Sequence, residues 1–207
     1  MPNAKFQLRY ERLVGEHVVA EPISEAHTQG LFEAGRHHED WQYLPIPGFP
    51  TRADAQRWVE QALALVAQKA QYPFVLVHVK TRAVIGSSRY LNIRERDRGL
   101  EIGYSWLARE HQRTGANTEA KLLLLANAFE RCGALRVELK TDSRNVRSQQ
   151  AIERIGAKRE GVLRKHMIAQ HGYVRDSVLY SIVDDEWPGV KRALQAKLGR
   201  HGQATPA

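Results

Sequence analysis

The sequence predicts one α+β (α/β) domain built on a mixed central sheet of about seven strands flanked by helices. Two observations carry this prediction. Stretches in which apolar and polar residues alternate are interspersed with stretches of helical periodicity, and the 207 residues, 43% of them hydrophobic, can bury a sizeable core. The strands expected at 100–107 and 135–141 are joined by one apolar helix, which predicts a parallel, right-handed β-α-β unit.

The first elements are a strand or an irregular strand pair, followed by two capped helices. Residues 13–23 carry the strand pattern, and Ser24 suits the N-cap of a first helix. Thr51, with Asp54 three residues later as a partial capping box, begins a second helix that we expect to end near Ala70.

Consecutive strands with short connections are expected in two places. Residues 72–80 and 83–93 lead through charged turns into the strand at 100–107, which predicts an antiparallel meander. Near the C-terminus, residues 157–168 and 173–183 predict a long hairpin.

Two helices follow the second strand of the parallel unit. Asn145 suits the N-cap of the first of them, and Gly156 suits its exit. The second is a final helix that packs one apolar face containing Trp187. We therefore place the domain at residues 1–198 and expect residues 199–207, which lack large apolar side chains, to form a disordered tail.

Residues 37–50 predict a loop rich in proline and aromatic side chains. Trp41, Tyr43 and Phe49 either build one wall of a substrate site or fold the loop onto the core, and the sequence leaves both open. Residues 37–40, His-His-Glu-Asp, lack the spacing of a metal-binding helix, so we expect no metal.

A loop of small and polar residues with a single glycine separates the strand at 100–107 from its helix: Gln112, Arg113, Thr114, Gly115, Ala116, Asn117 and Thr118. Such a loop leaves backbone N–H groups uncovered at a helix N-terminus, where the dipole favours an anion. A Walker loop needs Gly-Lys-Ser/Thr, and a dinucleotide fingerprint needs three glycines. Neither is present, so the loop predicts a phosphate cradle of another kind.

This loop resembles the acyl-CoA loop of the GCN5-related N-acetyltransferases, whose pattern is Gln/Arg-x-x-Gly-x-Gly/Ala. Gln112 and Gly115 match it, whereas Asn117 stands where the family usually has Gly or Ala. Residues 118–120 resemble the branch of ribosomal-protein alanine and serine N-acetyltransferases, and the resemblance covers roughly residues 11–198. It implies an enzyme that moves an acetyl group from acetyl-CoA to a primary amine, a protein N-terminus or a small amine, by direct attack in a ternary complex.

The resemblance also implies roles for individual residues. The family's counterpart of Asn145 bonds the pantetheine arm of the cofactor, and the counterpart of Ser148 lies near the thioester sulfur. Ile152 stands where many members have a tyrosine general acid, so Ser148 or a water is the expected substitute. The pantetheine amides should bind to the backbone of Ser105, Trp106 and Leu107. The pyrophosphate should bind to the loop from Arg113 to Thr118.

A base is needed because an amine with a pKa near 10 is only about a thousandth neutral at pH 7. Glu101 is the first candidate, since its counterpart in several relatives is the base. It lies three residues before Tyr104, which we expect to contact the substrate. A solvent-facing strand carboxylate is the alternative interpretation of Glu101. Glu160 is a second candidate base, with Asp176 behind it.

Composition and charge narrow the remaining classes. The net charge of +8 favours attraction to polyanions, but basic residues are spread along the chain with no run of five. The single cysteine, Cys132, excludes an internal disulfide and predicts a core residue. The sequence has no apolar run of about 18 residues and no signal-peptide pattern, so we expect a cytoplasmic protein that does not bind a membrane. We also expect that it does not bind nucleic acid and that it can form a homodimer. A non-catalytic acyl-CoA sensor and a basic module that docks on RNA or ribosomes are the alternatives.

Overall fold

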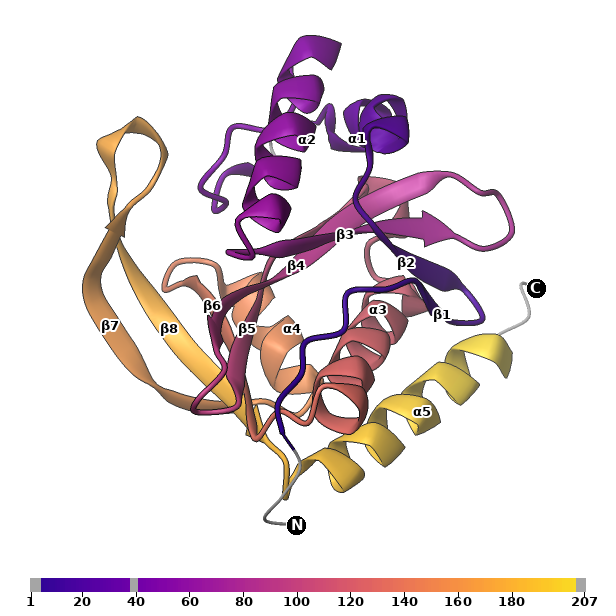
Figure 1. Cartoon of the computed structure of the whole chain (residues 1–207), viewed down its shortest axis with the longest axis vertical. Helices are drawn as coiled ribbons and strands as arrows, with labels where there is room; N and C mark the ends of the chain where they lie inside the picture. The colour runs from indigo at the N-terminus through magenta and orange to yellow at the C-terminus, as the bar shows by residue number, and fades with distance from the viewer. Residues whose placement is uncertain (1–4, 38–40, 204–207) are drawn as a thin grey trace.

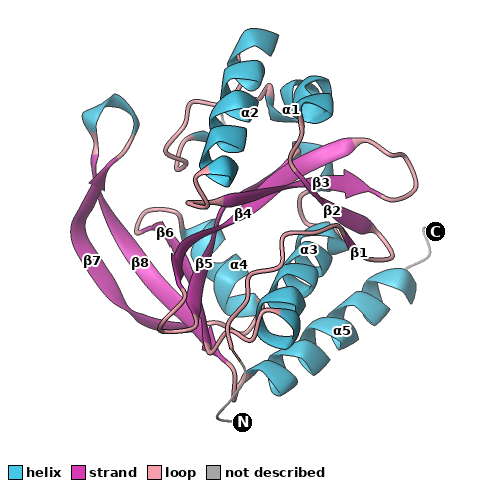
Figure 2. Ribbon diagram, viewed as in Figure 1, coloured by secondary structure: helices cyan, strands magenta, loops and turns pink. Residues whose placement is uncertain are grey.

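The computed structural model describes residues 5–37 and 41–203, which form an eight-stranded mixed sheet and five α-helices (Figures 1 and 2). The two-residue strand β1 accounts for the eighth strand, where the sequence predicted about seven. The strands are β1 (Leu13–Val14), β2 (Val18–Pro22), β3 (Tyr72–His78), β4 (Val84–Arg94), β5 (Gly99–Leu107), β6 (Arg136–Asp142), β7 (Lys158–Ile168) and β8 (Val174–Val183). The helices are α1 (Thr28–Gly35), α2 (Arg52–Ala67), α3 (Gly115–Ala126), α4 (Val146–Arg154) and α5 (Trp187–Gln203).

The strand order is β1-β2-β3-β4-β5-β6-β8-β7. β3, β4 and β5 pair antiparallel, which confirms the predicted meander, and β5 pairs with β6 in parallel through the crossover helix α3. This parallel pairing is short, because it runs from Gly99 opposite Arg136 only to Glu101 opposite Glu138. Both strands continue beyond this point without pairing to each other. They therefore separate at their C-terminal ends, next to the N-terminus of α3.

The helices cover the two faces of the sheet unequally. α1 and α2 lie on one face (Figure 1). α3, α4 and α5 lie on the other face, where α3 and α5 pack side by side. Two cores result: a larger one under α3, α4 and α5, and a smaller one between the sheet, α1, α2 and the loop 41–49. Cys132 is buried, as predicted. None of the described helices is both long and apolar enough to cross a bilayer.

Two predicted caps hold helix N-termini. Thr51 forms a capping box at the start of α2, and the helix ends at Ala67, three residues before the expected end. The Asn145 side chain accepts a hydrogen bond from the backbone N–H of Ser148 at 3.0 Å, which caps α4. Each such cap satisfies an N–H group that has no partner within its helix.

The strict alternation predicted for residues 100–107 is wrong in its second half. Ile102 lies in the core under α3, but Trp106 lies in the opposite core with α1 and α2. A bulge is the cause: the pairing of β5 with β4 shifts its register here, and Tyr104 adopts a φ of 50°. One extra residue reverses the facing of those that follow. Ser105 therefore faces α3, where its hydroxyl meets a lysine side chain.

The last helix passes the expected end of the domain. α5 runs from Trp187 to Gln203, so the boundary placed at residue 198 falls inside a helix, and residues 199–203 belong to the fold. Residues 204–207 lie outside the described residues. Leu194 anchors α5 in the core, and a helix once formed extends through residues that bury little themselves.

Candidate active site

A cavity of about 1190 Å³ lies where β5 and β6 separate. It is larger than most sites for small ligands and is bordered by the N-terminal ends of α3 and α4. Most of the predicted site residues line it: Tyr43, Glu101, Tyr104, Ser105, Trp106, Leu107, Gln112, Arg113, Thr114, Asn117, Thr118, Asn145 and Ser148. Trp41, Gly115 and Ala116 are not among the lining residues.

The loop before α3 brings the N-terminal end of this helix to the cavity. Thr114 is the N-cap: its hydroxyl accepts a hydrogen bond from the Ala116 N–H at 3.2 Å and donates one to the His111 carbonyl at 2.8 Å. The other N–H groups of a first helical turn have no partner within the helix. Arg113 has a φ of 62°, a conformation that costs free energy in a non-glycine residue and fixes a sharp turn at the cavity wall.

Three of the predicted loop residues shape the loop. The Gln112 side-chain amide donates a hydrogen bond to the Leu107 carbonyl at 2.9 Å, which ties the loop to the end of β5. Gly115 is the first residue of α3, and the Ala116 side chain is buried in the core. These contacts set the position of the exposed N–H groups.

Lys121 is a cavity residue that the sequence analysis did not identify as functional. Its Nζ lies 2.5 Å from Ser105 Oγ and 3.4 Å from Ser88 Oγ, and these two hydroxyls are 2.8 Å apart. Burial lowers the pKa of Lys121 to about 7, because the amine has hydroxyl partners and no carboxylate partner in the described chain. The available signal was a lone lysine surrounded by Ala and Leu in an apolar helix.

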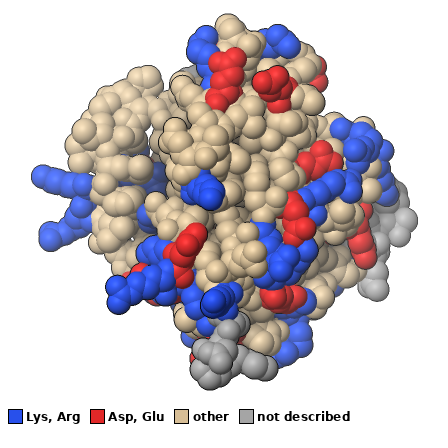
Figure 3. All heavy atoms as spheres, in the orientation of Figure 1, with Lys and Arg blue, Asp and Glu red and all other residues tan. Residues whose placement is uncertain are grey.

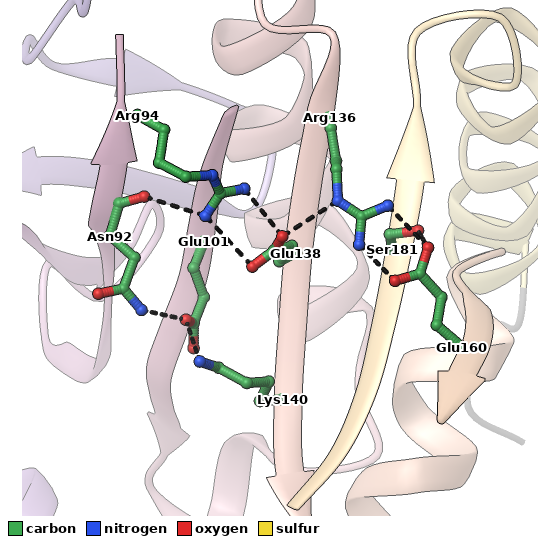
Figure 4. A network of polar contacts seen from close by, with 8 residues as sticks. All are labelled: Asn92, Arg94, Glu101, Arg136, Glu138, Lys140, Glu160 and Ser181. Atoms are coloured by element: carbon green, nitrogen blue, oxygen red, sulfur yellow. Dashed lines mark hydrogen bonds and ion pairs between the residues drawn. The ribbon is translucent and has the colours of Figure 1, made fainter. Parts of the chain in front are cut away.

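Glu101 lies in the cavity and is held by two side chains of neighbouring strands. Its Oε2 accepts a hydrogen bond from Asn92 Nδ2 at 2.7 Å and pairs with Lys140 Nζ at 2.9 Å (Figure 4). Oε1 has no hydrogen bond to the described residues. Gly103 has no Cβ to cover it, since an added Cβ would lie 3.2 Å from this oxygen. The carboxylate is therefore fixed on one side and open on the other.

Glu160 does not reach the cavity, so the second candidate base is wrong. It pairs with both terminal guanidinium nitrogens of Arg136 and accepts a hydrogen bond from Ser181 at 2.7 Å (Figure 4). The hydrogen bonds from Arg136 lower the pKa of Glu160 to about 2. Asp176, named behind it, accepts a hydrogen bond from the Lys165 N–H at 2.6 Å and does not line the cavity.

Ser148 and Asn145 lie together at the start of α4. The Asn145 side chain caps the helix, and both side chains line the cavity. Ile152 lies one turn further along α4 and also lines it. The position that holds tyrosine in many relatives of the resembled family is thus part of the cavity wall, without a hydroxyl.

Trp41 is a core residue, which corrects its assignment to the substrate site. It is 1% exposed, its indole N–H donates to the Gly35 carbonyl at 2.8 Å, and its ring packs against Phe49 and Trp106. For both Trp41 and Phe49 the loop has therefore folded onto the core. Tyr43 does line the cavity, as predicted.

The tip of the β7–β8 hairpin closes onto the loop 41–49. The Gln170 Nε2 lies within hydrogen-bond distance of three carbonyls of that loop, those of Trp41, Leu44 and Ile46, at 3.0, 2.6 and 2.6 Å, and its two N–H groups are shared among them. We call these contacts the Gln170 clamp. Tyr173 of the hairpin lies against the Arg144 guanidinium, 3.4 Å from its ring centroid. Segments more than 120 residues apart in sequence thus form one border of the cavity.

The charge of the cavity is strongly positive. Among the described lining residues, Glu101 is the single carboxylate, against eight basic side chains: Arg113, Lys121, Lys140, Arg147, Arg154, Arg175, Lys197 and Arg200. The outer surface seen in Figure 3 instead mixes basic and acidic side chains. The excess of basic side chains along the cavity favours anionic ligands there.

Metal binding has no support from the described residues, among which no group of three His, Cys, Asp or Glu side chains could hold an ion. Residues 38–40 of the His-His-Glu-Asp segment lie outside the described residues.

Comparison with known proteins identifies the class. Residues 17–158 match the family model described as the acetyltransferase (GNAT) domain, and the chain belongs to this family. The protein is therefore an acetyltransferase with the GNAT fold, a family that uses acetyl-CoA as cosubstrate.

Individual relatives agree with this assignment. The N-acetyltransferase YoaA of Bacillus subtilis, itself uncharacterized, is 24% identical over 168 residues, which cover 81% of this chain and 94% of YoaA. YdaF of the same organism, provisionally named a ribosomal N-acetyltransferase, is 36% identical over 100 residues, 48% of this chain and 54% of YdaF. The crystal structure of a GCN5-related N-acetyltransferase from Brucella melitensis has a TM-score of 0.86 and 28% identity, covering 92% of this chain and 86% of that one. The homodimer and the cytoplasmic location stay predictions.

Proposed function

We propose that this acetyltransferase binds acetyl-CoA between the separated ends of β5 and β6 and transfers the acetyl group directly to a primary amine, with Glu101 as the base. The observation that carries the proposal is the position of Glu101. Its open carboxylate oxygen lies in the same cavity as the uncovered N-terminus of α3.

The residues present fit the cosubstrate. The first turn of α3 offers backbone N–H groups to a pyrophosphate, and Arg113 adds a positive charge at the same place. On the side of β6, β5 has no strand partner beyond Glu101, although β4 still pairs with its other edge, so the β6-facing edge of Ser105 to Leu107 can pair with the pantetheine amides. Bound acetyl-CoA supplies an activated acetyl thioester.

Glu101 would take the proton from the attacking amine. Lys140 and Asn92 hold one carboxylate oxygen and leave the other free, which orients the base toward the cavity. A base positioned in this way contributes about a hundredfold to ten-thousandfold to the rate.

Ser148 would stabilise the negative charge that develops on the leaving sulfur. Its backbone is fixed by the Asn145 cap, and its hydroxyl lines the cavity. A serine hydroxyl is a weak acid, but a hydrogen bond to charge that develops in the transition state still lowers the barrier.

The class of the acceptor amine is inferred from a relative and from the cavity lining. The provisional name of YdaF favours a protein N-terminus, whereas a small amine is the alternative that the sequence left open. Tyr43 and Tyr104 line the cavity and would contact the acceptor.

The test is thiol release from acetyl-CoA with a broad panel of amines, including peptides with free N-termini, for wild type, Glu101→Gln and Glu138→Gln. Glu138 is the matched control, because it lies opposite Glu101 on β6 but its carboxylate binds Arg94 and Arg136 outside the cavity. We expect release with one amine class and a loss of about a hundredfold or more in Glu101→Gln only.

Two outcomes would contradict the proposal. Equal rates for Glu101→Gln and wild type across pH would remove Glu101 from the role of base. Tight CoA binding without release from any amine would favour a non-catalytic acyl-CoA sensor.

A further inference from the structure

Arg175 of β8 is a buried cation without a partner at the cavity wall. Its side chain is 8% exposed and lines the cavity. Its Nε has no hydrogen-bond partner, and its guanidinium makes no hydrogen bond or ion pair to the described residues. This burial is costly, because the side chain has lost most of its water without gaining a counterion, and the terminal nitrogens, unlike Nε, are accessible.

The two carboxylates near Arg175 already have other cations as partners. Both oxygens of Asp142 accept hydrogen bonds from the Arg144 guanidinium, at 3.0 and 2.9 Å. Glu101 is held by Lys140 and by an asparagine side chain. Burial lowers the pKa of Arg175 although Asp142 and Glu101 oppose this, so the two carboxylates do not compensate its desolvation.

Arg175 faces the same side of the sheet as Glu101. Val178, Tyr180 and Ile182 of β8 point into the core under the helices, so Arg175 and Ser181 point to the other face. Figure 4 shows Ser181 on the face that carries the polar network of Glu101. The guanidinium is therefore on the side of the cavity where the proposed base lies.

A second buried arginine has protein partners for part of its guanidinium. Arg89 is 4% exposed, and although Nε and one terminal nitrogen have no hydrogen-bond partner, its guanidinium lies over the rings of Trp58 and Tyr104 and donates a hydrogen bond to Gln71 at 2.7 Å. It does not line the cavity. Arg175 has neither a ring nor an acceptor in place, and it does reach the cavity.

We propose that Arg175 binds a carboxylate of the acceptor, so that the substrate is an amino acid or a related small molecule that carries an amine and a carboxylate together. This proposal rests on the transferase function above and specifies its substrate class. The planar fork of Arg175 suits bidentate binding of a carboxylate, while Glu101 faces the amine. A cavity with eight basic side chains and one carboxylate would repel a polyamine.

The test uses matched acceptors that differ only in the carboxylate. Thiol release from acetyl-CoA is measured with glycine, β-alanine and γ-aminobutyrate, each beside its amide, and with a neutral peptide that has a free N-terminus. We expect one amino acid to exceed its amide by at least about tenfold in kcat/KM in wild type. In Arg175→Met this preference should disappear, and Arg175→Lys should restore part of it, with KM for acetyl-CoA unchanged in both variants.

A structural role of Arg175 predicts a different result. Removing an unpaired buried charge should leave the melting temperature of Arg175→Met equal or higher, whereas loss of a structural arginine would lower it. A lower melting temperature with equal weakening of all acceptors would overturn the proposal. So would an amide or peptide preferred over every amino acid, although this would leave the transferase function standing.

A binding measurement decides the question without turnover. Calorimetric titration of the protein with CoA and then with N-acetylglycine or its amide compares the carboxylate with its neutral analogue. Tighter binding of N-acetylglycine to wild type, and its loss in Arg175→Met, supports the proposal even when no amine releases thiol. Equal binding of the two compounds overturns it.

Discussion

The two sides of the cavity neutralise their buried charges in different ways. On the side of the polar sheet face, Glu101 lies between Lys140 and Asn92, and the neighbouring Glu138 lies between two arginines. On the side of α3, Lys121 is buried, and its amine lies at the hydroxyls of Ser88 and Ser105. The sheet face pairs these two carboxylates with cations, whereas on the helix side burial lowers the pKa of the amine instead.

The two sides should therefore be sensitive to different changes. Ion pairs hold side chains from separate strands in one geometry, so the sheet face depends on many partners at once. Lys121 needs only burial and two hydroxyls. The helix side should therefore respond to pH, and the sheet face and its border should respond to the removal of single contacts.

The largest effect is expected from Lys121→Met. The folded protein releases the Lys121 proton above a pKa of about 7, while the unfolded chain keeps it to about 10.5. Between these two pH values the unfolded state binds more protons than the folded state. The free energy of unfolding of wild type should therefore rise as the pH is raised through this range. The variant has no such amine, so its free energy of unfolding should not rise in this way. It should exceed that of wild type by up to several kcal/mol at pH 6 and by less at pH 9.

Urea unfolding of both proteins at the two pH values measures this difference. An identical difference at pH 6 and pH 9 would mean that Lys121 keeps its proton in the fold, and the contrast between the two sides would fail.

An intermediate effect is expected from Gln170→Ala, which removes the Gln170 clamp. Three carbonyls of the loop 41–49 lose their donor, at a cost of about 1–3 kcal/mol for buried groups. We expect KM for the acceptor to rise about tenfold and KM for acetyl-CoA to stay within about twofold.

The matched control for the clamp is Gln56→Ala. Its side-chain amide donates to Glu60 at 2.9 Å on the exposed surface of α2, outside the cavity. Steady-state kinetics of both variants compare the same chemical change at two places. A rise in KM for acetyl-CoA alone would show that the clamp serves the other end of the cavity.

The smallest effect is expected from Thr114→Ala. Loss of the N-cap of α3 should cost about 1 kcal/mol of stability and raise KM for acetyl-CoA several-fold, because the first-turn N–H groups lose their fixed position. Thr114→Ser keeps the hydroxyl and should behave as wild type. An unchanged KM in Thr114→Ala would separate the cap from cosubstrate binding.

The sequence predicted those features that depend on neighbours in the chain. The caps at Thr51 and Asn145 and the parallel unit around α3 follow from local patterns, and all were confirmed. Glu101 was named from the resemblance to the acetyltransferase family, in which its counterpart is the base in several relatives, and the structure adds its partners Lys140 and Asn92.

Features that depend on distant contacts could not be predicted. At the bulge the positive φ belongs to Tyr104 and not to the preceding Gly103, and a tyrosine rarely adopts it, so the alternation pattern continued through the bulge. Trp41 was ambiguous because its burial depends on Phe49 and Trp106, which follow later in the chain. The position of Arg175 on the cavity wall follows only once β8 is inserted between β6 and β7.

The strand order also bears on how copies of this protein can associate. The sheet ends in β1, which has two residues, and in β7, whose exposed side chains include Lys158, Arg159, Arg164 and Lys165. A short edge strand and an edge rich in positive charge both oppose strand addition by another chain. A homodimer of this acetyltransferase should therefore be built from helices or loops, and a continuous sheet across two subunits is disfavoured.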